Sequence, residues 1–213
     1  NTQKLMAAQR KGGFPAEWLE GHGHNDFHKF RVNATAAWLY GCAAANSSIF
    51  GVGERTGNPP LEAMVIEAAQ ISGTNPQINY DAITELADYA RKEIGFDIPA
   101  NYPLVGADFN VTRAGIHADG LLKNEEIYNC FDTENLLKRP VEVAITDKSG
   151  AAGIKHWIER RFDIELSKQS SCIQKVKEKI DIEYADNRVS AISEKEMMAW
   201  VTEAFGDDIP PAR

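Results

Sequence analysis

The chain has 213 residues, of which 43% are hydrophobic and 25% charged, a composition typical of a globular protein with one large or two small domains. Its net charge of −8 argues against a nucleic-acid-binding protein, because that class needs a basic surface to displace counterions. No apolar run is long enough to span a membrane, and three widely spaced cysteines indicate neither a disulfide framework nor a thiolate zinc site. We therefore expect a cytoplasmic protein that binds neither nucleic acid nor membranes.

The first residues predict the end of a helix over 1–11, which Gly12 and Gly13 close. The chain starts without an initiator methionine, and this start does not resemble a signal peptide. A helix-like pattern that begins at once indicates a piece of a longer chain.

Two histidines come next, at the end of a strand predicted over 18–24. Side chains at positions i and i+2 of a strand point to the same face, so His22 and His24 can reach a single metal ion. Neutral imidazole suits a divalent cation such as Zn²⁺, and leaves positions for carboxylate, water and substrate oxygens. The alternative is a pair of surface or core histidines beside a turn.

A helix and a second strand follow the histidines. Apolar residues recur at helical spacing from Phe30 to Tyr40, and a short strand is predicted over 43–50. A glycine-rich loop, Gly-Val-Gly-Glu-Arg-Thr-Gly-Asn at 51–58, then precedes a helix that Pro59 and Pro60 open. This strand–helix–strand–helix order predicts an α/β fold with parallel strands, so the histidines and the glycine loop should lie at the same edge of the sheet.

The glycine loop carries three polar residues with two interpretations each. Glu54 and Arg55 are ordinary residues of a solvated turn, and Asn58 is a good cap for the following helix. Beside the histidine strand, however, all three would face the same opening, and an asparagine carbonyl is a suitable ligand for a hard cation.

The polar segment at 72–77 predicts the end of this first unit. Beyond it we expect an amphipathic helix over 82–94, an irregular segment over 98–111, and helices over 151–161, 167–184 and 194–205. The inward-facing residues predicted for the first of these helices are Ile83, Leu86, Ala87, Ala90 and Ile94. A capping box formed by Ser193 and Glu196 opens the last helix.

A further histidine, His117, lies in the glycine-containing segment 112–124. A single histidine in a turn is commonly a structural residue. A histidine in a movable segment can also act as a general acid or base over a site.

Three motifs stand in a familiar order and spacing. They are His-Gly-His-Asn-Asp at 22–26, the glycine loop at 51–58 followed by Pro-Leu-Glu-Ala, and Gly-Ile-His-Ala-Asp-Gly-Leu-Leu-Lys at 115–123. With these motifs the chain resembles the C-terminal part of the Claisen-condensing metallolyases on a TIM barrel, which include the 2-isopropylmalate, homocitrate, citramalate and Re-type citrate synthases. The amino-acid sequence at 35–41, 112–115 and 131–133 is most similar to that of the Re-type citrate synthases.

The resemblance implies a fold and a reaction. Residues 1–76 would form the C-terminal portion of a (β/α)₈ barrel, and residues 77–213 a mainly helical lid and C-terminal subdomain. The reaction would join acetyl-CoA to an α-keto acid such as oxaloacetate, 2-oxoglutarate or 2-oxoisovalerate, and then hydrolyse the thioester. A divalent ion (Mn²⁺, Mg²⁺ or Zn²⁺) would assist it.

The resemblance also implies roles for particular residues. It implies metal ligation by His22, His24 and Asn58, catalytic roles for Glu54 and His117, and substrate binding by Asn25, Asp26 and Arg55. The lid would cover the active site of a second subunit, which implies a homodimer.

The chain departs from the family pattern in two ways. The family's first barrel strand, which carries a further metal ligand, has no counterpart in these residues, so the site would need the missing N-terminal half. In addition, Arg113 and Ala114 replace a common Glu-Ser pair, and Ala118 replaces a common glutamine. Two alternatives remain open: an aldol or acyl-CoA lyase on the same barrel, and a non-catalytic fragment or partner subunit.

Overall fold

A computed structural model describes residues 2–113, 120–121, 124–127 and 129–206. The chain divides into two compact units, the first formed by Asn1–Glu93 with Pro103–Val105 and the second by Ile94–Tyr102 with Gly106–Arg213. The boundary between these two units thus lies near residue 94. The sequence analysis places the end of the barrel portion at residue 76. The boundary between a catalytic domain and a lid stays a prediction.

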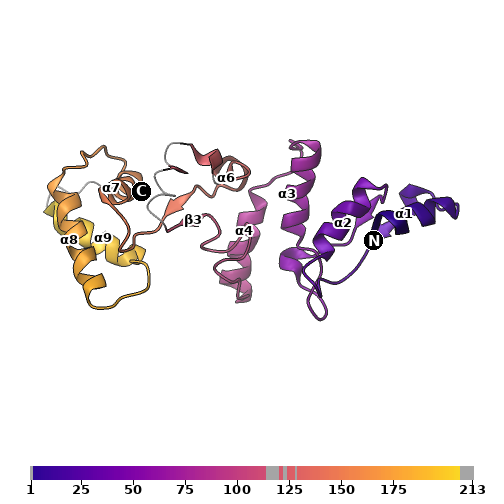
Figure 1. The fold of residues 1–213 in the computed structure, drawn as a ribbon, viewed down its shortest axis with the longest axis horizontal. Helices are drawn as coiled ribbons and strands as arrows, with labels where there is room; N and C mark the ends of the chain where they lie inside the picture. The colour runs from indigo at the N-terminus through magenta and orange to yellow at the C-terminus, as the bar shows by residue number, and fades with distance from the viewer. Residues whose placement is uncertain (1, 114–119, 122–123, 128, 207–213) are drawn as a thin grey trace. The chain divides into compact units, whose positions relative to one another are not determined.

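The first unit alternates helices with very short strands (Figure 1). Its elements in chain order are α1 (Thr2–Lys11), a 3₁₀ turn (Ala16–Trp18), β1 (Glu20–Gly21), α2 (Phe30–Leu39), β2 (Ala44–Ala45), a second 3₁₀ turn (Ile49–Gly51), α3 (Leu61–Ser72) and α4 (Ala82–Tyr89), which a π-helical turn (Ala90–Ile94) extends. Each predicted helix of this unit is present within a few residues of its expected ends.

The two strands are parallel, with Glu20 opposite Ala44 and Gly21 opposite Ala45. The sequence-based expectation of a parallel strand–helix–strand unit is therefore confirmed. Both strands are shorter than predicted over 18–24 and 43–50. A 3₁₀ turn takes up Trp18, and within the described chain β1 and β2 pair only with each other, so no neighbouring strand extends the ladder.

A small apolar cluster holds α1 and α2 against the strands. It consists of Met6, Ala37 and Cys42, with Leu19 packed against it. The thiol of Cys42 donates hydrogen bonds to the carbonyls of Leu19 (3.0 Å) and Ala44 (3.2 Å). The cysteine is thus a structural link between the segments that precede the two strands.

Helix α4 is only partly as predicted. Ile83, Ala87 and Ala90 are buried, whereas Leu86 is 42% and Ile94 67% exposed. The inward face is therefore narrower than the periodicity indicates. At residue 90 the helix widens into a π turn, which shifts the angular positions of the residues that follow, and Gly95 ends it with φ of 70°.

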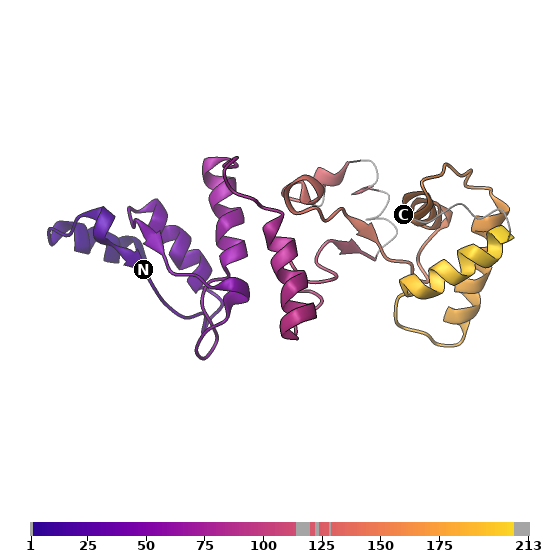
Figure 2. The ribbon, with the colours of Figure 1, turned by 180° about the vertical axis from the view of Figure 1, so that it is seen from behind.

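The second unit contains a short parallel pair, β3 (Val111–Thr112) with β4 (Glu142–Val143), which the sequence did not predict. Helix α6 (Thr133–Leu137) lies between these strands in the sequence. Three helices then form its main core: α7 (Ala151–Phe162), α8 (Ser171–Ala185) and α9 (Glu194–Phe205) (Figure 2). Ile154, Ile158, Val176, Ile180 and Val201 are all fully buried in that core.

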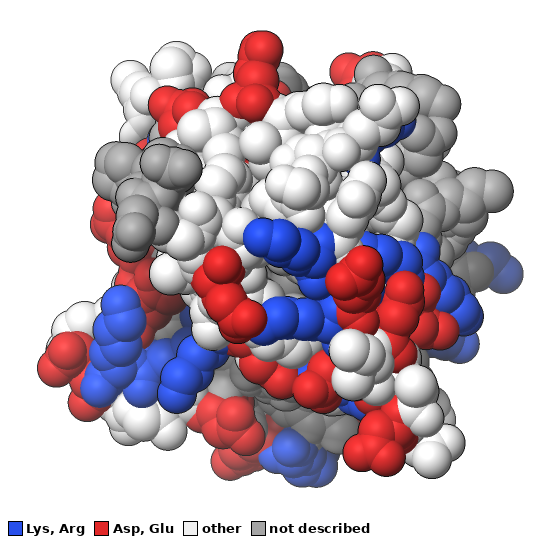
Figure 3. All heavy atoms as spheres, turned by 90° about the vertical axis from the view of Figure 1, so that its left-hand side faces the viewer, with Lys and Arg blue, Asp and Glu red and all other residues white. Residues whose placement is uncertain are grey.

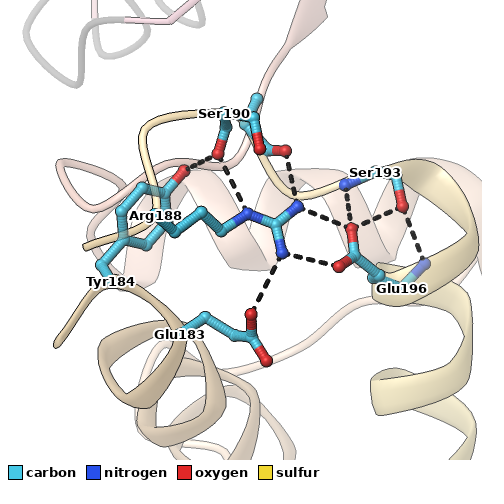
Figure 4. Close-up of polar contacts among 7 residues, drawn as sticks. Glu183, Tyr184, Arg188, Ser190, Ser193 and Glu196 are labelled. Carbon is cyan, nitrogen blue, oxygen red and sulfur yellow. Dashed lines mark hydrogen bonds and ion pairs between the residues drawn. The ribbon is translucent and has the colours of Figure 1, made fainter. Parts of the chain in front are cut away.

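The connection from α8 to α9 is built around Arg188 (Figure 4). Its guanidinium donates to both carboxylate oxygens of Glu196 (2.6 and 2.8 Å) and to Glu183 (3.2 Å). Ser193 and Glu196 form the predicted capping box at the start of α9. These charge-assisted bonds lower the pKa of Glu196 to about 2, chiefly through Arg188 and then through Ser193.

The outer face of this helical group is polar. Figure 3 shows acidic and basic side chains interspersed on the side that carries α8 and α9. Lys177 pairs with Asp181 along α8, and Lys179 pairs with Glu203 of α9. No helix in the described part of the chain is long and apolar enough to cross a membrane.

Candidate functional site

Two loops that follow the parallel strands are hydrogen-bonded to each other. The histidine loop (residues 22–29) follows β1, and the glycine loop (residues 51–58) follows β2. The backbone N–H of Asn25 donates to the carbonyl of Gly57 (3.0 Å), and His24 Nδ1 lies 3.1 Å from the Glu54 carbonyl oxygen. The fold therefore brings the two sequence motifs together, at the carboxyl ends of neighbouring parallel strands.

The glycine loop has a fixed shape. The N–H of Asn58 donates to the carbonyl of Gly51 (3.0 Å), and the N–H of Leu61 donates to Ser48 (2.8 Å) at the base of the loop. Gly57 has φ of 78°, and a Cβ there would lie 2.0 Å from the Gly51 carbonyl oxygen. Only glycine fits at position 57, and its carbonyl is the acceptor that holds the histidine loop.

The two imidazoles are neighbours, with ring centroids 5.5 Å apart and ring planes at 87°. His24 Nδ1 faces a backbone carbonyl, which only accepts hydrogen bonds, so this nitrogen carries the proton. His22 Nδ1 lies 3.0 Å from the side-chain oxygen of Asn46. Within the described chain neither Nε2 has a polar partner, so both are free to coordinate, which is the usual arrangement of metal-bound histidines.

Gly23 lies between the histidines because the ring of Phe30 occupies the space beside it. A Cβ at residue 23 would meet three atoms of that ring, the nearest at 2.2 Å. The first residue of α2 thus packs against the backbone that joins the two imidazoles, and glycine permits this close approach.

Asp26 ties the histidine loop to the glycine loop. Its carboxylate accepts a hydrogen bond from the Thr56 hydroxyl (2.7 Å) and two from the Arg55 guanidinium (3.4 Å each). The bond from Thr56, and then that from Arg55, lowers the pKa of Asp26 below its usual value. The Arg55 side chain remains 59% exposed, so it retains donors that face solvent.

Asn58 has a buried side-chain oxygen with no hydrogen-bond partner in the described chain, while its Nδ2 donates to the Val52 carbonyl (3.3 Å). An orphaned acceptor of this kind suits a cation. Glu54 is exposed on the same loop.

Two other predicted site residues lie differently. The side-chain oxygen of Asn25 accepts from the N–H of Phe30 (3.3 Å), the first residue of α2, so it holds the histidine loop at the start of that helix. His117 lies outside the described residues.

Sequence reasoning missed Asn46 and Thr56. Asn46 directly follows β2, at the position that His22 occupies after β1, and its N–H donates to the Gly21 carbonyl (2.8 Å). That shared position after a strand is the signal that would have identified it. Thr56 has no such signal, because its role depends on the fold of the glycine loop.

The donor set fits a divalent cation but is incomplete. His22, His24 and Asn58 offer two imidazole nitrogens and an amide oxygen, ligands that Zn²⁺, Mn²⁺ and Mg²⁺ accept to different degrees. Across the described parts of the chain, no group of three or more His, Cys, Asp and Glu side chains gathers where it would hold a metal ion. A closed coordination sphere would need further ligands.

Comparison with known proteins places the chain among a family of synthases. Residues 7–89 match the HMGL-like family. The chain is 52% identical over 203 residues to the Citrate (Re)-synthase of Syntrophus aciditrophicus, a match that covers 92% of this chain and 32% of that protein. It is 47% identical over 199 residues to the Citrate (Re)-synthase of Clostridium kluyveri, covering 92% and 44%. A 2-isopropylmalate synthase of Yersinia pestis is 31% identical over 141 residues, covering 65% and 27%. The chain thus spans less than half the length of these curated relatives.

Proposed function

Because this chain belongs to the HMGL-like family, together with the Re-type citrate synthases and related synthases, we propose that its protein condenses acetyl-CoA with an α-keto acid and hydrolyses the thioester. The single observation that supports this function best is the pairing of the histidine loop with the glycine loop. It leaves two adjacent imidazoles with free Nε2 atoms at the carboxyl ends of parallel strands. That edge is where barrel enzymes of this architecture carry their active sites.

The proposed fold is the C-terminal part of a (β/α)₈ barrel, with β1 and β2 as two of its strands. Parallel strands joined by α2 and followed by α3 support this assignment. The remaining strands, with a further acidic metal ligand, would come from an N-terminal half of the barrel outside these residues. The two citrate synthases are more than twice as long as the part that aligns with this chain, which leaves room for such a half.

His22 and His24, with Asn58, are the residues that would hold a divalent ion. Bound there, such an ion would supply Lewis-acid polarisation of the keto group. Mn²⁺, Mg²⁺ and Zn²⁺ all remain in the proposal.

The residues around the histidines have separate proposed roles. Asp26 locks the two loops through Thr56 and Arg55 and thereby holds His24 against the glycine loop. Arg55 keeps exposed donors that suit the carboxylate of a keto acid. Glu54 would line the pocket, Asn25 would hold the loop at the start of α2, and His117 would move a proton during the reaction.

Oxaloacetate is the keto acid that the comparisons favour, because acetyl-CoA and oxaloacetate together make the citrate skeleton named in the two relatives. The test is thiol release from acetyl-CoA by the full-length protein with oxaloacetate, 2-oxoglutarate and 2-oxoisovalerate. We expect release with oxaloacetate at the highest rate, and its loss on chelation of divalent ions.

The same assay separates the alternatives. A protein that cleaves a hydroxyacyl-CoA and releases no thiol with any keto acid would be a lyase. A protein that binds acetyl-CoA without turnover under either condition would be a non-catalytic partner. The identity to named synthases favours the condensing reaction over both.

A further inference from the structure

A chain of side-chain hydrogen bonds runs from Glu20 through Asn46 to His22. The Asn46 Nδ2 donates to Glu20 Oε1, and the Asn46 Oδ1 lies 3.0 Å from His22 Nδ1. Glu20 belongs to β1, while Asn46 follows β2 and is held by its own N–H on the Gly21 carbonyl (2.8 Å). The contact thus spans the two strands at the place where the histidine loop begins.

The chemistry of this chain of bonds determines its direction. An ionised carboxylate only accepts hydrogen bonds, so the amide of Asn46 must turn its NH₂ group toward Glu20. That orientation turns Oδ1, an acceptor, toward His22. The Nδ1 of His22 must then carry the proton, and its Nε2 keeps the lone pair that a metal requires.

From this geometry we infer that Asn46 is a positioning residue that fixes the Nδ1–H tautomer of His22, and that Glu20 fixes the orientation of Asn46. The link to metal binding rests on the proposed function. His24 needs no such residue, because a backbone carbonyl, that of Glu54, holds its Nδ1. The two histidines are therefore oriented by different partners. Only the partner of His22, the Asn46 side chain, can be removed by a substitution.

The experiment uses the full-length protein with Asn46→Ala, and Asn46→Asp as the variant that keeps an acceptor. Ring ¹⁵N shifts of the histidines in the metal-free protein report the tautomer, and His22→Ala assigns the signal. Calorimetric titration with Mn²⁺ reports affinity. Asn33→Ala is the matched control, since Asn33 contacts Thr2 (3.2 Å) on the surface of α2 and neither histidine.

We expect wild type, Asn46→Asp and Asn33→Ala to show the Nδ1–H tautomer of His22, and Asn46→Ala to show a mixture with the Nε2–H form. Mn²⁺ should bind Asn46→Ala about 10–100-fold more weakly, the usual cost of losing such a partner. Asn46→Asp should recover most of this loss. Glu20→Gln should have an intermediate effect on the His22 tautomer. A glutamine amide both donates and accepts hydrogen bonds, so residue 20 would no longer force Asn46 into one orientation.

An unchanged tautomer in Asn46→Ala would overturn the inference, whatever its Mn²⁺ affinity. Failure of the proposed function has a different signature. If His22→Ala bound Mn²⁺ as tightly as wild type, the metal site would be elsewhere, while the tautomer measurement would still decide the role of Asn46.

Discussion

At the scale of single residues, the site depends on a glycine that leaves space for a neighbouring aromatic ring. Gly23 separates the two histidines, and the Phe30 ring fills the space that a side chain at 23 would need. The imidazoles are thus positioned both by bonds to Asn46 and Glu54 and by a packing contact behind them. The histidine motif at 22–26 does not indicate this contact, because Phe30 lies in the next helix, α2.

We predict that Gly23→Ala displaces the Phe30 ring and with it the histidine loop. The free energy of unfolding should fall by about 1–3 kcal/mol, the cost of overpacking, and Mn²⁺ affinity should fall as well. Urea denaturation and calorimetric titration measure the two effects. Gly150→Ala is the control, because a Cβ at 150 has no atom within 4 Å. Equal behaviour of the two variants would show that Phe30 yields without moving the histidines.

The two proposed roles of histidine predict different kinetic defects. His24→Ala should abolish metal binding and with it keto-acid binding, because Nε2 is the proposed ligand atom. His117→Ala should leave both nearly unchanged while turnover falls about 10²–10⁴-fold, the usual contribution of a general acid or base. Metal titration with steady-state thiol release separates these effects. Wild-type turnover by His117→Ala would make His117 a structural residue.

At the scale of elements, the helices and the parallel pair β1–β2 were predictable, whereas the strand pair β3–β4 was not. Capping and glycine signals set the ends of α2, α3 and α9, because these signals are local. The β3–β4 pair joins Val111 to Glu142 across an intervening helix, a partnership that no local pattern indicates. In the site, the motif identified the histidines and the glycine loop. Asn46 has only its position after the second strand as a signal, and the role of Thr56 required the fold.

The α8–α9 connection gives a prediction for pH dependence. The folded-state pKa of Glu196 is lowered to about 2 from 4.5, so the stability that Glu196 contributes is present above pH 4.5 and is lost as pH falls toward 2. At pH 7, Glu196→Gln should lower the free energy of unfolding by about 1 kcal/mol, a modest value because the side chain is partly exposed.

Urea denaturation at pH 7 and pH 3 measures this effect. The difference between wild type and Glu196→Gln should shrink at the lower pH. Glu178→Gln, at an exposed position of the neighbouring helix α8, is the control and should show little change at either pH. A constant gap between Glu196→Gln and wild type would assign the stabilisation to packing and not to charge.

At the scale of the whole molecule, the first unit leaves apolar side chains uncovered. Trp18 is 75% and Phe27 83% exposed, and Val32 of α2 is 56% exposed. The β1–β2 sheet has two strands in the described chain, so both of its edges lack a partner strand there. Closed barrels remove such edges, and exposed edges and apolar patches promote association.

If β1 and β2 belong to a barrel, the isolated 213-residue chain should not be a well-behaved monomer. Its mass by light scattering should exceed 23.6 kDa and increase with concentration, because the uncovered edge and apolar residues associate. The full-length protein should instead show one defined mass, that of a homodimer. Co-expression of the preceding segment with this chain is the direct control, and it should restore a defined species that binds Mn²⁺. A monodisperse monomer of the isolated chain across the concentration range would argue against the barrel, since it would mean that the faces left open here need no further strands.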